Sequence, residues 1–256
     1  MPSYLITGVN RGIGWAFLRQ ISDDANNIVV GTVRNKAAVE KKISDELGGR
    51  SNNSLDAVSE ITGGKLDYII ANAGYVSDWS PYDPIGKLGE TPKQLEEDLL
   101  TCFKVNVIGN VHLFNTHMPL VLKGNAKKVI TITSGMADID LINQYRLDAG
   151  APYSISKGGM NIAVSKFHAQ YAEDGVLFMG ICPGVVETGH NDNLSQDQLE
   201  SAVRMAAKFE QYAPGGSQPR APEDSVADVM KVIYDSSLEN GRGGAYISHL
   251  GSKRWL

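Results

Sequence analysis

The sequence has little of what marks secreted, membrane-spanning or metal-binding proteins. It contains only two cysteines, Cys102 and Cys182, both in apolar segments and without the spacing of metal ligands. We therefore expect buried free thiols, no disulfide framework and no metal site. No apolar run approaches the ~20 residues needed to cross a bilayer, and the N-terminus shows no basic region or cleavage site. These absences predict a cytoplasmic protein that does not associate with membranes.

Basic residues are also fewer than acidic ones. The chain has 24 lysines and arginines against 29 acidic residues, which gives a net charge of −5. This balance argues against a nucleic-acid-binding surface. The 256 residues, 42% of them hydrophobic, suffice for a substantial core. Since α/β folds of this size are commonly single units, we expect one domain over residues 1–256.

A glycine-rich turn lies near the N-terminus. The short apolar run 4–7 reads as a strand, and TGVNRGIG follows with Gly8, Gly12 and Gly14 before an amphipathic helix. Such a turn lets the backbone approach a pyrophosphate, and the helix N-terminus offers free N–H groups. The spacing G-x-x-x-G-x-G differs from the usual dinucleotide fingerprint. Glycine turns also join strands to helices without ligands, but the context favours a nucleotide site.

Two arginines accompany this turn. Residues 28–32 predict a second strand that ends in VRN, which places Arg34 just beyond it, while Arg11 lies inside the glycine turn. In Rossmann-type folds this position faces the adenosine ribose, where an acid binds the 2′-hydroxyl and an arginine accommodates a 2′-phosphate. We therefore expect NADP(H) in preference to NAD(H). The alternative is that both arginines are ordinary surface charges.

The stretch between the second strand and the next apolar run is short. Residues 37–47 look helical, and GGRSNNS then breaks the pattern. Only residues 55–62 remain before GGKLDYII, too few for both a strand and a full helix. The third strand of a Rossmann-type sheet, its following helix, or both are therefore expected to be reduced or absent.

The middle of the chain supplies further strands. Residues 68–71 form a strand that ends in ANAG, and the loop after it carries Trp79 and Tyr82, expected to border a substrate cleft. A helix begins at Thr91 with the capping signature T-x-x-Q and reaches Asn106. Residues 129–133 form a strand with Ser134 at its carboxyl end, where open α/β sheets bind ligands. Considered alone, Ser134 is equally compatible with a surface turn.

The segment PYSISKGG places Tyr153 and Lys157 four residues apart in a predicted helix that runs to about 171. Side chains at this spacing share one helical face. A nearby ammonium favours phenolate, so the pKa of the tyrosine is expected to fall from ~10 toward working pH, which suits proton exchange with an alcohol or carbonyl oxygen. The pattern also occurs by chance on solvated helices. The acidic stretch between Ser134 and Tyr153 is expected to be an irregular, solvated loop.

A long, partly helical insertion over residues 189–221 is the candidate substrate lid. A capping box, SQDQ, opens its helix at Ser195. Its Met205, Phe209 and Tyr212 either cover an apolar substrate or pack the helix on the body, and the sequence favours neither. Trp255 is a candidate for closing the cleft.

Together these motifs resemble the short-chain dehydrogenase/reductase family over nearly the whole chain, in the style of its carbonyl-reductase-type branch with many fungal ketoreductases. TGVNRGIG resembles the family's cofactor turn, NAG its sheet-stabilising motif, and PG with Thr188 its nicotinamide segment. The resemblance implies a single Rossmann-type doubly wound parallel sheet flanked by helices. The implied catalytic residues are Asn106, Ser134, Tyr153 and Lys157. The implied cofactor residues are Gly8, Asn10, Arg11, Gly12, Ile13, Gly14, Arg34, Asn72, Ala73, Gly74, Tyr153, Lys157, Pro183, Gly184, Val186 and Thr188.

The implied activity is reduction of a small or aromatic ketone by NADPH. Tyr153 would give its proton to the developing alkoxide, Ser134 would align that oxygen, and Lys157 would lower the tyrosine pKa and hold the nicotinamide ribose. Asn106 would support a water that links Lys157 to solvent, and Asp56 would contact the adenine. The alternatives are an NAD-preferring secondary-alcohol dehydrogenase and a non-catalytic NADP(H) sensor. The family commonly associates through the helices that carry Asn106 and Tyr153, so a homodimer or homotetramer is expected.

Overall fold

The computed structural model describes residues 1–47, 58–189 and 194–256. The strands are β1 (Ser3–Thr7), β2 (Ile28–Thr32), β3 (Tyr68–Ala71), β4 (Lys128–Ile132), β5 (Leu177–Cys182) and β6 (Tyr246–Ser248). The α-helices are α1 (Gly12–Ser22), α2 (Lys36–Leu47), α3 (Val58–Ile61), α4 (Ile85–Leu88), α5 (Pro92–Phe103), α6 (Gly109–Val121), α7 (Ile139–Tyr145), α8 (Ala151–Tyr171), α9 (Gln196–Tyr212) and α10 (Pro222–Asp235). A π-helical turn (Lys104–Ile108) joins α5 to α6, and a 3₁₀ turn (Gly135–Ala137) follows β4.

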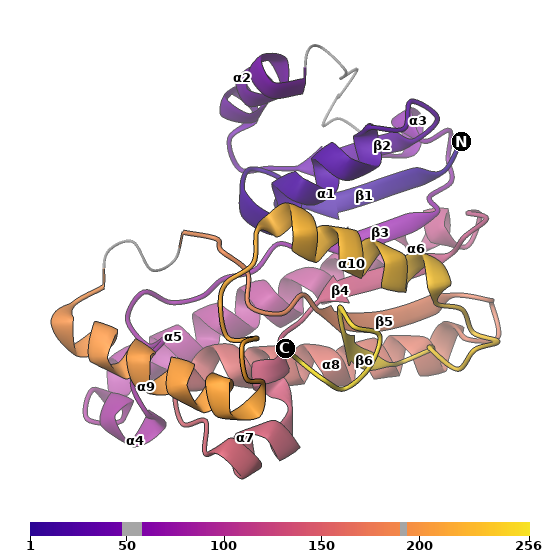
Figure 1. The fold of residues 1–256 in the computed structure, drawn as a ribbon. Coiled ribbons are helices and arrows are strands. Elements are labelled where there is room, and N and C mark those ends of the chain that lie inside the picture. The colour runs from indigo at the N-terminus through magenta and orange to yellow at the C-terminus, as the bar shows by residue number, and fades with distance from the viewer. Residues whose placement is uncertain (48–57, 190–193) are drawn as a thin grey trace.

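The strands form one parallel sheet in the order β2-β1-β3-β4-β5-β6, with helices on both faces (Figure 1). Strands buried on both faces are expected to be continuously apolar, and β5 is an example, with all of its residues buried. The chain runs outward from β1 to β2 and then crosses back to β3. This reversal opens a crevice at the carboxyl ends of β1 and β3, the usual ligand site of such sheets. The predicted Rossmann-type fold is confirmed.

Two apolar cores lie on the two faces of the sheet. Helices α1 and α10 cover one face, where Phe17 and Val229 are fully buried. Helices α6 and α8 cover the other face, where Phe114 and Phe167 pack edge to face at 5.3 Å. Because successive strand residues point to opposite faces, Leu5 joins the second core while its neighbours in β1 join the first.

The edge beside β2 is reduced, as the sequence predicts. Among the described residues no strand lies between β2 and β3, and only the four residues of α3 are helical after α2. The sheet accordingly ends at β2 rather than at a further strand. Asp56, the candidate adenine contact, lies outside the described residues.

Two local expectations are wrong. Thr91 precedes α5 but makes no capping hydrogen bond with its side chain, because its hydroxyl donates to the Leu88 carbonyl instead. The stretch after Ser134 is not an irregular loop, since α7 forms within it. The Asp138 carboxylate accepts a hydrogen bond from the Leu141 N–H at 2.8 Å and so caps this helix. Asp138, which the sequence placed in a solvated loop, is therefore a buried N-cap residue.

A third, smaller core lies beyond the carboxyl edge of the sheet. It joins Leu141, Leu147, Cys182 and Trp255, with Phe209 and Tyr212 of α9 packed against them. The predicted capping box of α9 is present, with both hydrogen bonds between Ser195 and Gln198. Figure 1 shows α9 and the C-terminus on the same side of the sheet. Of the two roles that the sequence left open for Phe209 and Tyr212, the structure shows the second: they pack α9 on the body of the protein.

Candidate active site

A cleft of about 610 Å³ lies across the carboxyl edge of the sheet. Ser134, Tyr153 and Lys157 line it together with the glycine turn, and Asn106 lies behind its wall. Apart from Asp56, which lies outside the described residues, every residue predicted to bind the cofactor lines this cleft: Gly8, Asn10, Arg11, Gly12, Ile13, Gly14, Arg34, Asn72, Ala73, Gly74, Tyr153, Lys157, Pro183, Gly184, Val186 and Thr188. The fold therefore brings together motifs that are up to 180 positions apart, from Gly8 to Thr188.

The glycine turn packs against β3 with no room for a side chain. A Cβ added to Gly14 would lie 2.2 Å from the Gly8 carbonyl oxygen and 2.6 Å from Nδ2 of Asn72. That Asn72 amide donates to the Thr7 carbonyl at 3.0 Å, and the Ala73 N–H donates to the Thr7 hydroxyl at 2.9 Å. The NAG segment thus fastens the end of β3 to the end of β1 and fixes the shape of the turn.

The N-terminus of α1 opens into the cleft. Arg11 occupies the N-cap position and makes no capping hydrogen bond with its side chain. The first N–H groups of a helix have no partners within the helix, and they bear the positive end of its dipole. Backbone donors bared in this way, beside a turn that only glycine can form, suit the pyrophosphate of a dinucleotide. The residues present therefore fit a nicotinamide dinucleotide.

Arg11 and Arg34 border the same end of the cleft. Both side chains are exposed, and among the residues that the structure describes neither guanidinium takes part in an ion pair. A guanidinium binds phosphate through paired hydrogen bonds. These two groups leave positive charge available at the wall of the cleft.

Tyr153 and Ser134 meet at the floor of the cleft. Tyr153 is half-buried on α8, and a hydrogen bond from the Ser134 hydroxyl lowers the pKa of its phenol. Burial has the larger, opposite effect, so the pKa of Tyr153 is raised above its ordinary value. The predicted fall toward working pH is not observed, and Tyr153 is a protonated phenol at neutral pH. A protonated phenol is the form that a general acid requires.

Lys157 explains why that prediction is wrong. Its ammonium is 4% exposed and donates to the Ile132 carbonyl at 2.8 Å, and Nζ lies 5.6 Å from the Tyr153 ring centroid. Burial lowers the pKa of Lys157 to about 8. The ammonium thus donates to a backbone carbonyl and lies over the Tyr153 ring, and desolvation by burial dominates the pKa of Tyr153.

Asn106 lies in the π-helical turn between α5 and α6, fully buried. Its side-chain oxygen accepts from the Tyr75 N–H at 2.8 Å, and Nδ2 donates to the Tyr75 carbonyl and the Ser156 hydroxyl, both at 2.9 Å. A β-carbon added to Gly74 would lie 3.5 Å from Oδ1 of Asn106 and 3.6 Å from Nζ of Lys157. Asn106 therefore fixes the NAG loop beside Lys157. Single π-turns of this kind are frequent at functional sites.

The segment after β5 closes the cleft opposite the glycine turn. Gly184 adopts φ +82°, and the Ser225 hydroxyl donates to the Pro183 carbonyl at 2.8 Å. A Cβ on Gly12 would reach the Thr188 methyl at 3.4 Å. The two loops thus approach each other across the cleft, which places Thr188 beside the α1 N-terminus.

The substrate side of the cleft differs from expectation. Tyr75 and Val76 line the cleft itself, whereas Tyr82 and Met205 line a separate hollow of about 140 Å³. Trp255 is 3% exposed within the third core and does not line the cleft. The prediction that Trp255 closes the cleft is therefore wrong, because Trp255 packs beneath the site rather than over it.

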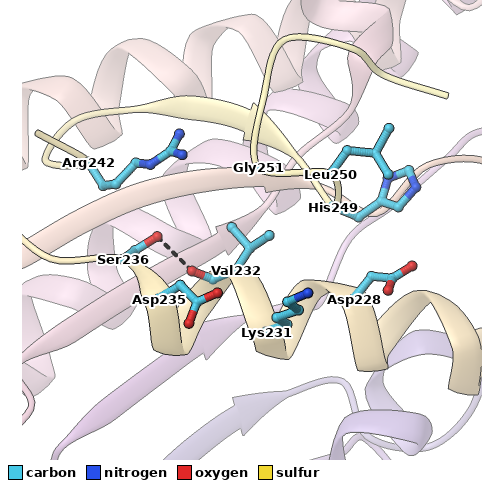
Figure 2. A pocket seen from close by; sticks show the side chains of 9 residues that line it. All are labelled: Asp228, Lys231, Val232, Asp235, Ser236, Arg242, His249, Leu250 and Gly251. Atoms are coloured by element: carbon cyan, nitrogen blue, oxygen red, sulfur yellow. Dashed lines mark hydrogen bonds between the residues drawn. The ribbon is translucent and has the colours of Figure 1, made fainter. Parts of the chain in front are cut away.

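A further hollow of about 380 Å³ lies between α10 and the segment after β6 (Figure 2). Asp228, Lys231, Asp235 and Arg242 surround it with mixed charges, and Asp228 pairs with Arg220 at 2.7 Å. His249 lines the hollow and packs its ring against Gly184, whose added Cβ would meet it at 2.9 Å. This hollow lies behind the cleft and shares none of its lining residues.

Within the described ranges, no group of three or more His, Cys, Asp or Glu side chains is placed to hold a metal ion. No helix in the same part of the chain is long and apolar enough to cross a membrane.

Sequence reasoning missed several lining residues and supports. Thr32, Val33, Tyr75, Val76, Val105, Ile132 and Thr133 also line the cleft. Four of them lie at or directly after the carboxyl ends of β2 and β4, and counting the end of each predicted strand as part of the cleft would have found those four. Tyr246 and Cys182, which contact the turn that carries Ser134, have no local signal. Their contacts arise only when β4, β5 and β6 lie side by side.

The chain is similar to known proteins along its whole length. The model of the short chain dehydrogenase family matches residues 3–199. The chain is 50% identical to the short chain dehydrogenase virK of Hypocrea virens and 42% identical to the short-chain dehydrogenase/reductase iacC of Pestalotiopsis fici, with all of each chain covered. Among solved structures, the NADPH-bound carbonyl reductase from chicken fatty liver superposes with a TM-score of 0.72 over 98% of both chains at 19% identity. At that identity the likeness concerns the fold alone.

Proposed function

We propose that this chain is an NADPH-dependent carbonyl reductase. The premise is that the chain belongs to the short-chain dehydrogenase family and is an oxidoreductase of the NAD(P)-dependent short-chain type. The observation that carries this proposal is a single cleft lined by Ser134, Tyr153 and Lys157 together with the glycine turn, Arg11 and Arg34. A panel of ketones and aldehydes, assayed by NADPH consumption, tests it. A flat response from protein that binds NADPH would contradict it.

The nicotinamide, when bound, supplies a hydride to the carbonyl carbon. The remaining steps are carried out by residues of this chain. The Ser134 hydroxyl donates a hydrogen bond to the substrate oxygen and aligns it, and Tyr153 transfers its phenolic proton to that oxygen as negative charge develops. Lys157 stabilises the resulting phenolate and holds the ribose, and Asn106 keeps the loop beside Lys157 in place. The glycine turn and the α1 N-terminus would bind the pyrophosphate.

The substrate is proposed to be a small or aromatic ketone. Tyr75, Val76 and Val186 line the cleft together with Ser134 and Tyr153 and provide apolar surface around the reacting oxygen. Apolar walls with few polar groups are typical of small-molecule sites. Ser134 and Tyr153 then supply the polar contacts that orient a carbonyl.

Arg34→Ala tests the cofactor preference. Loss of the guanidinium removes a partner of the 2′-phosphate, so the Kd for NADPH is expected to rise about tenfold or more while the Kd for NADH stays unchanged. Fluorescence titration of both cofactors measures this. Arg19→Ala is the matched control, because Arg19 is an exposed arginine of α1 that pairs with Glu223 and does not line the cleft. Equal weakening of both cofactors by Arg34→Ala would contradict the proposal.

We also propose that the chain forms a homodimer through α5, the π-helical turn and α8. Apolar side chains on this face are exposed: Leu100, Phe103, Ile108, Ile155 and Ile162, with Ile162 65% exposed. A cluster of this kind on helices that pack together marks an association surface. Sedimentation is expected to show twice the chain mass of 27.6 kDa, and the double variant Leu100→Glu/Ile162→Glu is expected to be monomeric. A monomeric wild-type protein would contradict this proposal.

A further inference from the structure

The peptide that carries Ser134 is held from beneath by residues that do not line the cleft. The Tyr246 hydroxyl of β6 donates a hydrogen bond to the Ser134 carbonyl oxygen. The next N–H, that of Gly135, donates to Sγ of Cys182 at 3.1 Å. The carbonyl and the N–H of the Ser134–Gly135 peptide group are thus bound by side chains of two different strands, and Ser134 itself lines the cleft.

Tyr246 belongs to a closed chain of hydrogen bonds. The Thr133 hydroxyl donates to the Asn161 side-chain oxygen at 2.7 Å, and Asn161 in turn hydrogen-bonds to the Tyr246 hydroxyl. Tyr246 then donates to Ser134, the residue after Thr133. Burial raises the pKa of Tyr246 well above its ordinary value, so its phenol stays protonated and able to donate. Two consecutive residues at the end of β4 are thereby fixed by one buried network.

Cys182 joins the two loops on which the site depends. Its sulfur accepts hydrogen bonds from the N–H groups of Gly135, after Ser134, and of Gly184, in the segment after β5. The thiol is 4% exposed, and burial raises its pKa, so it remains neutral. Sulfur is a weak acceptor. Among the described residues, however, the Gly135 N–H has no other acceptor than this sulfur.

Trp255, near the C-terminus, packs against both Tyr246 and the turn after Ser134. Its ring stacks on that of Tyr246 with the centroids 4.4 Å apart, and its backbone N–H donates to the Tyr212 hydroxyl at 2.9 Å. A Cβ added to Gly135 would lie 2.8 Å from Cβ of Trp255. Trp255 therefore contacts both the turn after Ser134 and the ring of Tyr246.

We propose that Tyr246 and Cys182 are positioning residues for carbonyl reduction: they hold Ser134 so that its hydroxyl reaches both Tyr153 and the substrate oxygen. The inference rests on the proposed function. A hydrogen-bond donor acts on developing charge only when it is held in place before the reaction, and a small displacement costs a large factor in rate. The effect of Tyr246 is therefore transmitted through Ser134 and not through cofactor binding, whereas Cys182 acts on the turn after Ser134 and also contacts Gly184 in the segment after β5.

Tyr246→Phe tests the inference, because it removes one hydroxyl and keeps the ring that stacks on Trp255. The kcat for reduction is expected to fall about tenfold, while the Kd for NADPH stays within about twofold of wild type. In a Ser134→Ala background the same change is expected to cost less than about twofold, since the group it positions is gone. Tyr234→Phe is the control, because its hydroxyl hydrogen-bonds to that of Tyr4, at 3.4 Å, and Tyr234 does not line the cleft.

Cys182→Ala and Cys182→Ser form a second pair. Alanine removes the acceptor for Gly135 and is expected to lower kcat in the same way, whereas serine restores an acceptor and is expected to recover most of the rate. This pair replaces Tyr246→Phe if that variant does not fold. An unchanged kcat in Tyr246→Phe, or an equal loss in the wild-type and Ser134→Ala backgrounds, would overturn the inference.

Failure of the proposed function is recognised separately. If the wild-type protein reduces no carbonyl compound, the crystal structures of wild type and Tyr246→Phe decide the positioning role by themselves. The inference predicts that the Ser134 hydroxyl leaves Tyr153 in the variant. Superposable Ser134 side chains in the two structures would overturn it whatever the activity.

Discussion

Tyr153→Phe is expected to lower kcat for carbonyl reduction by a hundredfold or more and to affect the Kd for NADPH far less. The phenolic proton is the one that neutralises the developing alkoxide, and a positioned general acid typically contributes about 10²–10⁴-fold. The raised pKa of Tyr153 keeps that proton in place at neutral pH. Phenylalanine preserves the ring and its packing, so only the acid is lost. Steady-state kinetics together with NADPH titration measure the two effects separately.

Tyr171→Phe is the matched control for this variant. Tyr171 lies at the end of the same helix, α8, where its ring stacks on Phe167 and Phe178 away from the cleft. Its loss of a hydroxyl is expected to change kcat by less than about twofold, since it touches no reacting atom. Near-normal turnover of Tyr153→Phe would remove Tyr153 from the mechanism.

Gly14→Ala is expected to weaken NADPH binding by a hundredfold or more. On helix propensity alone the change would stabilise α1 by roughly 1 kcal/mol. The added Cβ, however, would lie 2.2 Å from the Gly8 carbonyl oxygen and 2.6 Å from the Asn72 amide nitrogen, so the turn and the NAG segment must separate. Because these two segments line the nucleotide end of the cleft, the site is distorted where the pyrophosphate would bind. Thermal unfolding with and without NADPH, together with titration, reports stability and binding.

The control for Gly14→Ala is Gly86→Ala. Gly86 is an exposed helical glycine of α4, and a Cβ there meets nothing within 4 Å. This variant is expected to bind NADPH like wild type and to gain a few tenths of a kcal/mol in stability. If Gly14→Ala also bound NADPH normally, the glycine turn would not be the pyrophosphate site.

Much of the cleft could be predicted because its residues are marked by local pattern. Gly8, Gly12 and Gly14 follow a strand and open a helix, and Ser134 follows a run of buried strand residues. In a parallel sheet these positions all meet at one edge, so a correct assignment of the strands already assembles the site. The shortened stretch after α2 was likewise visible from its length alone.

What could not be predicted depends on contacts between distant segments. The pKa of Tyr153 follows from how deeply the fold buries the phenol and from the direction in which Lys157 points, and neither follows from their spacing of four. Asp138 reads as a solvated acid until α7 forms and uses it as a cap. Phe103 lies on the proposed dimer face and is 41% exposed, and no local pattern marks it as exposed. Tyr246 carries no motif, and its contact with Ser134 requires β6 to pair beside β5.

The central claim is that this cleft transfers a hydride from NADPH to a carbonyl carbon with Tyr153 as the acid. The most direct measurement incubates the protein with a panel of ketones and NADPH deuterated at nicotinamide C4, and determines the isotopic mass of any alcohol formed. The account predicts an alcohol with one deuterium on its carbinol carbon, formed by the wild-type protein and reduced at least about a hundredfold in Tyr153→Phe. Protein that binds NADPH and yields no deuterated alcohol from any ketone would contradict it.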